Sequence, residues 1–237
     1  MALPKISHPM FDVVIPSTKK KIKIRPMLVK EEKILLMAKT SDDPTAILPA
    51  VKQVVNNCIV DGDIDVDKLA LFDIEYLFIK IRSFSVSNVV KVSYRDNSDD
   101  KVYDFEIDLN GVEVQFPKNI EKTVKMTDTT GIIMKYPEAS LYSDEEFLNS
   151  APEEIIENLI TRCIDKVYDG DEIFDAKTFT LKEIKEFVEQ LDINTYDKMK
   201  VFLTDLPKLY HKLEYKNSKD EDREIIMSSL NDFFTLR

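Results

Sequence analysis

Glycine is rare in this sequence, which has only four glycines among its 237 residues. Each one follows an Asp, Asn or Thr, as is typical of turns. The four are Gly62, Gly111, Gly131 and Gly170. None belongs to a glycine-rich loop of the kind that holds phosphate groups, so the known nucleotide-binding fingerprints are absent.

Histidine and cysteine are equally scarce, with two of each. His8 and His211 lie far apart and lack the spacing of a helical metal pair or of a known catalytic triad. Cys58 and Cys163 are too few for a disulfide framework or an all-cysteine zinc site, and we expect free thiols. The sequence makes no positive case for an enzyme. We therefore predict no catalytic residue, no cofactor and no metal ligand.

Long apolar runs are also missing. The first residues, MALPKISHPMFDVV, lack the apolar stretch of a signal peptide, and no window reaches the roughly 20 apolar residues of a membrane span. We therefore expect no membrane span and a chain that stays in the cytoplasm where it is made. The net charge of −11 repels phosphate backbones and argues against nucleic-acid binding.

One basic stretch interrupts this acidic chain: STKKKIKIRP, residues 17–26. Ile22 and Ile24 alternate with basic residues, which predicts a strand with one charged, solvated face. The alternative interpretation is a docking face for an acidic protein partner. Its candidate contact residues are Lys20, Lys21, Lys23 and Arg25.

The patterning along the chain predicts an α+β fold. An N-terminal β-hairpin surrounds PSTKK, and a β meander covers 88–116, followed by a further hairpin in 121–137. Apolar spacing and capping residues predict helices at 29–40, 45–60, 69–82, 151–163, 181–191 and 195–206. Two of these helices begin with a capping box, Ser150 with Glu153 and Thr180 with Glu183.

An internal repeat is the main prediction about organisation. VKVSYRDNSDDKVYDFEIDLNGV and HKLEYKNSKDEDREIIMSSLNDF align without a gap, and each follows a helix ending in Cys, a DGD turn and a second helix. This order predicts two helix-helix-β-hairpin modules, at about 44–116 and 151–237. The N-terminal hairpin and the central β segment would be additions to the first. The expected domains are therefore 1–136 and 151–237, with 137–150 as a linker.

The acidic turns CIVDGDIDVD and CIDKVYDGD allow an alternative function. Their aspartates, Asp61, Asp63, Asp169 and Asp171, could serve a metal-binding module, for calcium or a similar ion, or a metal-dependent hydrolase. A helix-loop-helix calcium loop, however, needs Gly at position 6 and Glu at position 12, and neither turn provides both. The simpler interpretation is a solvated turn that precedes a helix.

Three stretches carry a family resemblance: IPSTKKKIKIRPMLVKEEKILLMA, FDIEYLFIKIRSFSVSNVVKV followed by DFEIDL, and the closing LNDFF. Together they resemble the baseplate hub assembly proteins of T-even-like contractile-tailed bacteriophages, over nearly the whole chain. Some relatives carry paired cysteines at the strand turns, as in a zinc ribbon. The turns RDNSDD and KNSKDED contain no cysteine, so no zinc site carries over.

The resemblance implies a non-enzymatic tail morphogenesis factor, a chaperone or a minor component, that acts while the central hub of the baseplate is assembled. The implied partners are the hub subunits and the tape-measure protein, in the host cytoplasm or in the virion baseplate. The terminal LNDFFTLR offers Phe233 and Phe234 as further candidate contact residues. Core packing is the alternative for these two, because large apolar side chains are usually buried.

Overall fold

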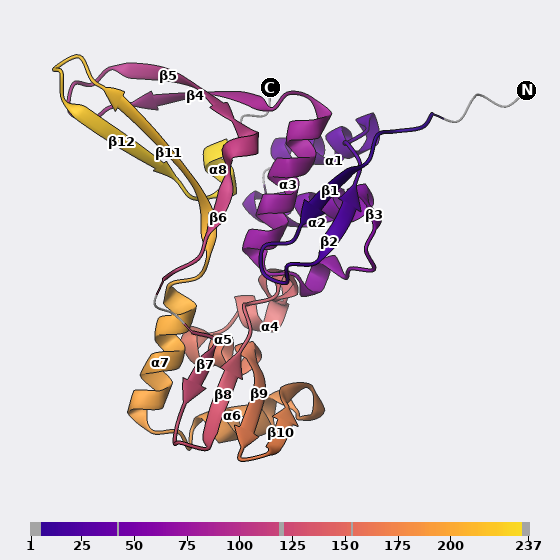
Figure 1. Cartoon of the computed structure of the whole chain (residues 1–237), viewed down its shortest axis with the longest axis vertical. Coiled ribbons are helices and arrows are strands. Elements are labelled where there is room, and N and C mark those ends of the chain that lie inside the picture. Colours follow the sequence, from indigo (N-terminus) through magenta and orange to yellow (C-terminus); the bar gives the residue numbers. More distant parts are fainter. Residues whose placement is uncertain (1–5, 42, 119–120, 153, 234–237) are drawn as a thin grey trace, which may run out of the picture. The chain divides into compact units, whose positions relative to one another are not determined.

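The computed structural model of the chain describes residues 6–41, 43–118, 121–152 and 154–233. Two compact units emerge (Figure 1): unit 1 comprises Met1–Gln115 and Lys208–Arg237, and unit 2 comprises Phe116–Pro207. Helices and antiparallel sheets occur in both, which confirms the α+β class. The units divide the chain differently from the predicted domains, because residues 208–237 group with the N-terminal part.

The N-terminal part of unit 1 combines a small sheet with three helices. The sheet has the order β1 (Phe11–Val14), β2 (Lys21–Ile24) and β3 (Ile59–Asp61). The helices are α1 (Val29–Thr40), α2 (Ile47–Cys58) and α3 (Leu71–Ser85). Alternation along β2 buries Ile22 and Ile24 and leaves Lys21 and Lys23 exposed, as the sequence predicts for a strand with one solvated face.

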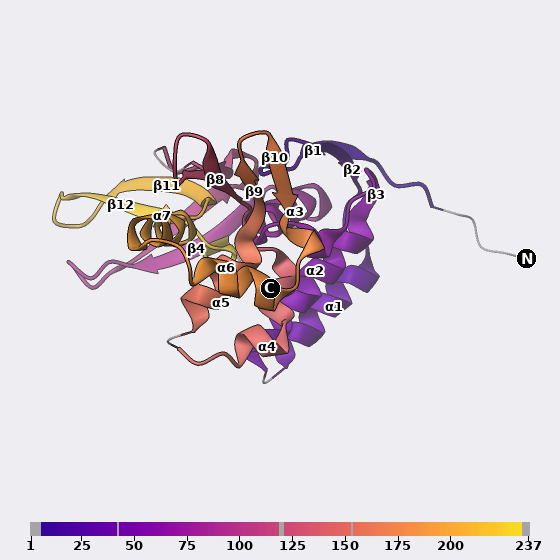
Figure 2. The same ribbon diagram turned by 90° about the horizontal axis from the view of Figure 1, so that it is seen from below.

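Two β-hairpins make up most of the rest of unit 1. One joins β4 (Val89–Arg95) to β5 (Val102–Asp108), and the other joins β11 (Lys208–Lys216) to β12 (Asp222–Met227). Figures 1 and 2 show the two hairpins side by side and extending in the same direction. The unit also contains β6 (Glu113–Gln115) and α8 (Leu230–Phe233). The predicted meander is wrong in its last pairing, because β6 pairs with β11 and not with β5.

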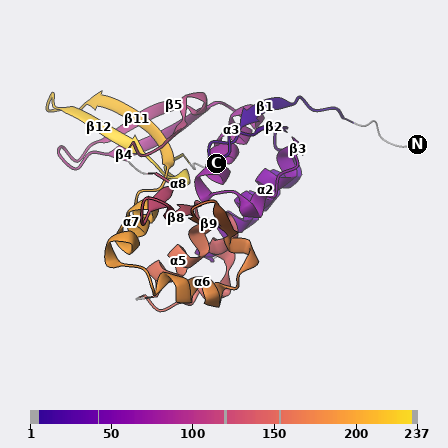
Figure 3. The same ribbon diagram turned by 60° about the horizontal axis from the view of Figure 1, so that its bottom comes forward.

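Unit 2 places helices against a four-stranded antiparallel sheet. The sheet has the order β10 (Glu172–Asp175), β9 (Ile164–Asp169), β8 (Thr130–Met134) and β7 (Thr123–Lys125). The helices are α4 (Glu145–Leu148), α5 (Ile155–Cys163), α6 (Leu181–Val188) and α7 (Ile193–Thr204). Figure 3 shows α5 and α6 on one side of β8 and β9. The core between these layers includes Ile132, Met134, Ile160 and Phe202.

Residues 137–150, predicted as a linker, contain regular structure. A 3-10 helix covers Ala139–Ser143, and α4 follows directly, with the Asp144 carboxylate accepting a hydrogen bond from the N–H of Phe147. The capping box of Thr180 and Glu183 is confirmed at the start of α6. Ser150 does not cap α5: the N-cap residue is Glu154, while Ser150 Oγ accepts a hydrogen bond from Asn158. Its predicted partner, Glu153, lies outside the described residues.

A backbone hydrogen bond and a register shift recur at matching places in the two units and support the predicted repeat. In unit 1 the N–H of Arg25, after β2, donates to the carbonyl of Cys58 over 2.9 Å; in unit 2 the N–H of Lys135, after β8, donates to the carbonyl of Cys163 over 2.7 Å. The register between β2 and β3 shifts at Lys23/Ile24, and that between β8 and β9 shifts at Ile133/Met134. The hairpins that the sequence treats as additions thus occupy matching places, β1-β2 beside β3 and β7-β8 beside β9.

The hairpins that the repeat aligns without a gap differ in length at their tips. In the first, Arg95 pairs with Val102 and the turn covers 96–101; in the second, Lys216 pairs with Asp222 and the turn covers 217–221. The second turn is one residue shorter, so the alignment needs a gap there. The repeat itself stays a prediction, which the matching registers support.

Candidate functional site

The basic stretch exposes three of its four predicted contact residues to solvent. Lys20, Lys21 and Lys23 are exposed, and Lys20 Nζ donates to the backbone carbonyl of Asp63 over 2.9 Å. Lys23 lies opposite Asp61 on β3. These lysines form an exposed basic face on a chain of net negative charge.

Arg25 does not share that face. Its side chain is only 14% exposed, and Nη2 lies 2.9 Å from Oε1 of Glu31, a carboxylate on α1 that is fully buried. The same guanidinium donates to the carbonyl oxygens of Pro26 and Asn57. The hydrogen bond that Arg25 donates to Glu31 raises the pKa of Arg25. Burial acts to raise the pKa of the Glu31 carboxyl, but the hydrogen bonds that it accepts from Arg25 and from the N–H of Leu28 hold that pKa below its ordinary value. The structure thus gives Arg25 an internal role.

Phe233 is not available for the partner contact that the docking interpretation requires. Phe233 on α8 is fully buried, with its ring edge-on to His211 at a centroid distance of 6.4 Å. Core packing, the alternative weighed for this residue, therefore describes its place. Phe234 lies outside the described residues.

The acidic turns lie in different units and carry different roles. Asp63 has a positive φ of 44° and uses its backbone carbonyl to accept from Lys20. In unit 2, the Asp169 carboxylate accepts a hydrogen bond from the Thr130 hydroxyl over 2.9 Å. Within the described ranges, no three His, Cys, Asp or Glu side chains gather closely enough to hold a metal ion.

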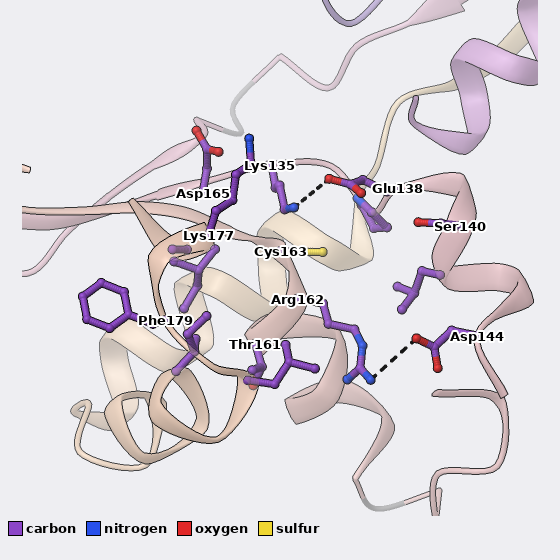
Figure 4. A pocket seen from close by; sticks show the side chains of 16 residues that line it. Lys135, Glu138, Ser140, Asp144, Thr161, Arg162, Cys163, Asp165, Lys177 and Phe179 are labelled. Atoms are coloured by element: carbon purple, nitrogen blue, oxygen red, sulfur yellow. Dashed lines mark hydrogen bonds and ion pairs between the residues drawn. The ribbon is translucent and has the colours of Figure 1, made fainter. Parts of the chain in front are cut away.

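A polar cavity of about 300 Å³ lies in unit 2 (Figure 4). Lys135 Nζ is 2.7 Å from the Glu138 carboxylate on its wall, and Arg162 Nη2 lies 3.9 Å from the carboxylate of Asp144. Figure 4 shows the Cys163 thiol between these two basic side chains. In the matching place of unit 1, Arg25 Nη1 lies 3.8 Å from the sulfur of Cys58.

The two thiols at these matching places have the wrong protonation state for nucleophilic chemistry. Burial raises the pKa of Cys58 to about 11 and that of Cys163 to about 12, so both are neutral thiols near pH 7. The thiolate is the reactive form of cysteine. Each basic group beside Cys163 already faces a carboxylate. The cavity therefore holds a neutral thiol beside paired charges and no thiolate nucleophile near pH 7.

A comparison with protein families identifies the class of protein. The model of a family described as T4 bacteriophage base plate protein matches residues 8–235, nearly the whole chain. The chain belongs to this family. Comparisons with curated proteins and with solved structures found no match.

Membership makes this base plate protein a component of the phage baseplate, with other baseplate proteins as its partners. It agrees with the resemblance inferred from the sequence motifs. In the part of the chain that the structure describes, no helix has the length and apolar character needed to cross a membrane.

Sequence reasoning missed the contact that joins the two long hairpins of the base plate protein. Asp96, after β4, is fully buried and accepts hydrogen bonds from Tyr215 Oη at 2.7 Å and from the guanidinium of Arg223. The N–H of Ser98 also donates to Asp96 and, with Tyr215 and Arg223, lowers the pKa of its carboxyl. Asp99 receives three further bonds from Tyr103 and Ser218. We call this set of contacts the hairpin clasp.

The clasp had only a faint signal in the sequence. Asp96 and Asn217 hold corresponding positions at the tips of the aligned hairpins, and both are polar. Each accepts a bond from the N–H two residues later, and each is buried in the structure. A polar residue at the same position of both tips indicates that the tips make specific contacts. The alignment does not indicate which residue of the other hairpin each one contacts.

Proposed function

We propose that this base plate protein is a non-enzymatic assembly factor for the central hub of the baseplate, acting through protein-protein contacts. The observation that carries the proposal is the family match over residues 8–235. The side-chain chemistry supports it. Both cysteine thiols have a raised pKa, and around the polar cavity Lys135 is paired with Glu138 and Arg162 with Asp144.

The hub subunits and the tape-measure protein are the proposed partners, and contact with them would take place in the host cytoplasm while tails are built. The basic face of Lys20, Lys21 and Lys23 is the proposed docking surface for an acidic partner. Complementary charge speeds the encounter of two proteins and selects the orientation in which they meet. On a chain of net charge −11, a local basic face would give that selection a direction.

Genetic removal tests the proposed role. The gene for this protein is deleted from a phage that carries it. Tail intermediates from the infected cells are then separated by sedimentation and examined by electron microscopy. We expect baseplates that lack a complete central hub, and restoration when the protein is supplied from a plasmid. Complete, functional tails in the absence of the protein would contradict an assembly role.

Mass spectrometry of purified virions distinguishes the two forms of the proposal. A transient chaperone is abundant in infected cells and missing from finished particles, whereas a minor component is retained at a fixed copy number per tail. A constant copy number would assign the second form.

A further inference from the structure

An apolar groove of about 490 Å³ lies open in unit 2, between the β9-β10 hairpin and α6. Its wall includes Val167 and Phe174 from the hairpin, Phe179 from the connection to α6, and Ile184 and Phe187 from α6 itself. Phe174 is 41% exposed and Phe179 is 44% exposed. Aromatic side chains left this open on a folded domain mark an interaction site more often than isolated surface residues do.

The corresponding positions in unit 1 are closed. Helices α3 and α6 begin at Leu71 and Leu181, and aligning those starts matches Phe179, Ile184 and Phe187 with three residues of unit 1. These are Leu69, Ile74 and Leu77, and each is at most 5% exposed. The same apolar positions are therefore buried in one unit and partly open to solvent in the other.

A turn of the chain itself is bonded to the start of α3, next to these buried positions. The connection from β1 to β2 covers residues 15–20, and the N–H and hydroxyl of Ser17 both donate to the carboxylate of Asp73, the third residue of α3. Ile15, two residues earlier, is fully buried. In unit 2 the residue matching Asp73 is Glu183, which is exposed on the rim of the groove. The connection from β7 to β8 covers only 126–129, two residues fewer.

The charges of the groove and of this turn are complementary. The segment 164–191, which contains the groove, carries eight acidic residues and four lysines. Asp169 and Glu183 both lie on the groove lining. The turn of unit 1 at 15–20 reads IPSTKK, an isoleucine and a proline followed by two hydroxyl residues and two lysines.

The geometry points to the groove of unit 2 as the docking site for a turn from a partner protein, with a buried aliphatic residue followed by hydroxyl and basic side chains. The partner's turn would take the place that residues 15–20 take in unit 1. The inference rests on the proposed function in one respect: the partner is taken to be another baseplate protein.

A synthetic peptide can stand in for that turn. The probe is a fluorescein-labelled peptide of residues 12–21, DVVIPSTKKK, titrated with the purified full chain and followed by fluorescence anisotropy. We expect saturable binding with a Kd below about 1 mM, and at least tenfold weaker binding when the peptide carries Ile15→Asp. Failure of the peptide to bind, or equal binding of both peptides, would overturn the inference.

Variants of the chain locate the binding. One variant combines Phe174→Ser with Phe179→Ser and removes two half-exposed aromatic side chains from the groove. The matched control combines Ile193→Ser with Val201→Ser, at exposed apolar residues of α7 in the same unit. Thermal unfolding shows that each variant is folded. The groove variant should lose at least tenfold in peptide affinity and the control should keep it. Equal affinities would place binding elsewhere and contradict the inference.

The same two variants, supplied to a phage that lacks the gene, separate this inference from the proposed function. Loss of tail assembly with the groove variant alone supports docking in the groove. Normal assembly with the groove variant, while the gene itself is needed, contradicts docking in the groove and leaves the assembly role standing. If tails form without the gene but the peptide still binds to the groove, the assembly role alone is wrong.

Discussion

The guanidinium of Arg223 on β12 forms a bidentate ion pair with Asp96 at the tip of the β4-β5 hairpin, with Nε and Nη2 each 3.2 Å from a carboxylate oxygen. Asp96 is fully buried, whereas the Arg223 side chain is 38% exposed. A carboxylate without water around it depends on such partners. The pair therefore fixes one hairpin on the other across more than a hundred residues of sequence.

Asp96→Asn should loosen the clasp. The amide keeps the shape but removes the charge, and its NH₂ group faces donors from Tyr215, Arg223 or Ser98 in place of an acceptor. We expect the Tm of the protein to fall by about 5 °C. Hydrogen exchange of backbone amides in 95–103 and 215–223 should become faster.

Asp222→Asn is the control for that variant, because Asp222 is 88% exposed on the β11-β12 hairpin, next to Arg223 in the sequence. Its Tm should stay within about 1 °C of the parent value, as expected for an exposed site. Equal Tm values for the two variants would mean that the clasp contributes nothing to stability.

Glu31→Gln should destabilise the N-terminal part of unit 1. It leaves the Arg25 guanidinium without its charged partner in a place where the side chain is only 14% exposed. Removing one partner of a buried pair costs about 3 kcal/mol of unfolding free energy. Urea unfolding measures the loss.

The neighbouring Glu32→Gln provides the comparison, since Glu32 is exposed on the same helical turn. Its effect should stay within about 0.5 kcal/mol. A loss for Glu31→Gln no greater than this would show that Arg25 is satisfied by the carbonyls of Pro26 and Asn57 alone.

Glu75 should make stability depend on pH. Burial raises its pKa to about 7 from an ordinary value of 4.5; the charge of Asp232 adds to this and the N–H of Leu230 opposes it. Because the pKa is higher in the folded chain than in the unfolded one, the protonated form stabilises the fold. That stabilisation is complete below pH 4.5 and is lost as the pH rises to about 7.

Glu75→Gln removes this titration and keeps an oxygen acceptor for the N–H of Leu230. The unfolding free energy at pH 8 should rise by up to about 3 kcal/mol relative to the parent, with little difference at pH 4. Urea unfolding at both pH values tests this. The same difference between the two proteins at each pH would contradict a raised pKa.

Charge reversal tests the basic face. Lys20→Glu, Lys21→Glu and Lys23→Glu together should slow association with the hub proteins about tenfold at low salt and leave the fold intact. The control reverses three exposed lysines of unit 2: Lys118, Lys125 and Lys198. Surface plasmon resonance gives the rates. An equal loss of association rate in both variants would mean that association responds to the net charge of the chain and does not depend on the basic face.

Local structure could be predicted well from this sequence because it depends on local patterns. The alternation of Ile22 and Ile24 with lysines gives β2 one buried face, and the apolar spacing through Val51, Val54 and Cys58 buries one side of α2. The capping box at Thr180 fixes the start of α6. In each case a period of two or of 3.6 residues, or a cap, contains the information needed.

Pairings over long distances could not be predicted in this way. β6 follows β5 directly in the sequence but pairs with β11, because strand pairing depends on tertiary packing that no local period encodes. The alternation along β2 predicts that Arg25 lies on the solvent face. The shifted register at Lys23/Ile24 and the buried Glu31 give it an internal role instead.

The candidate site was predicted in part for the same reasons. Exposure of Lys20, Lys21 and Lys23 follows from the strand period and the polar turn before it. Burial of Phe233 depends on where α8 packs, which the sequence does not show. The groove of unit 2 becomes visible only when the two units are compared residue by residue, since Leu69, Ile74 and Leu77 are buried where Phe179, Ile184 and Phe187 line the groove.

The most direct test of the account is affinity purification of the tagged chain from infected cells before tails are complete, with quantitative mass spectrometry and chemical cross-linking. The account predicts that hub subunits and the tape-measure protein are enriched over a purification from cells infected with untagged phage, and that cross-links to them join to this chain. Enrichment of neither would contradict the assignment of this base plate protein to hub assembly.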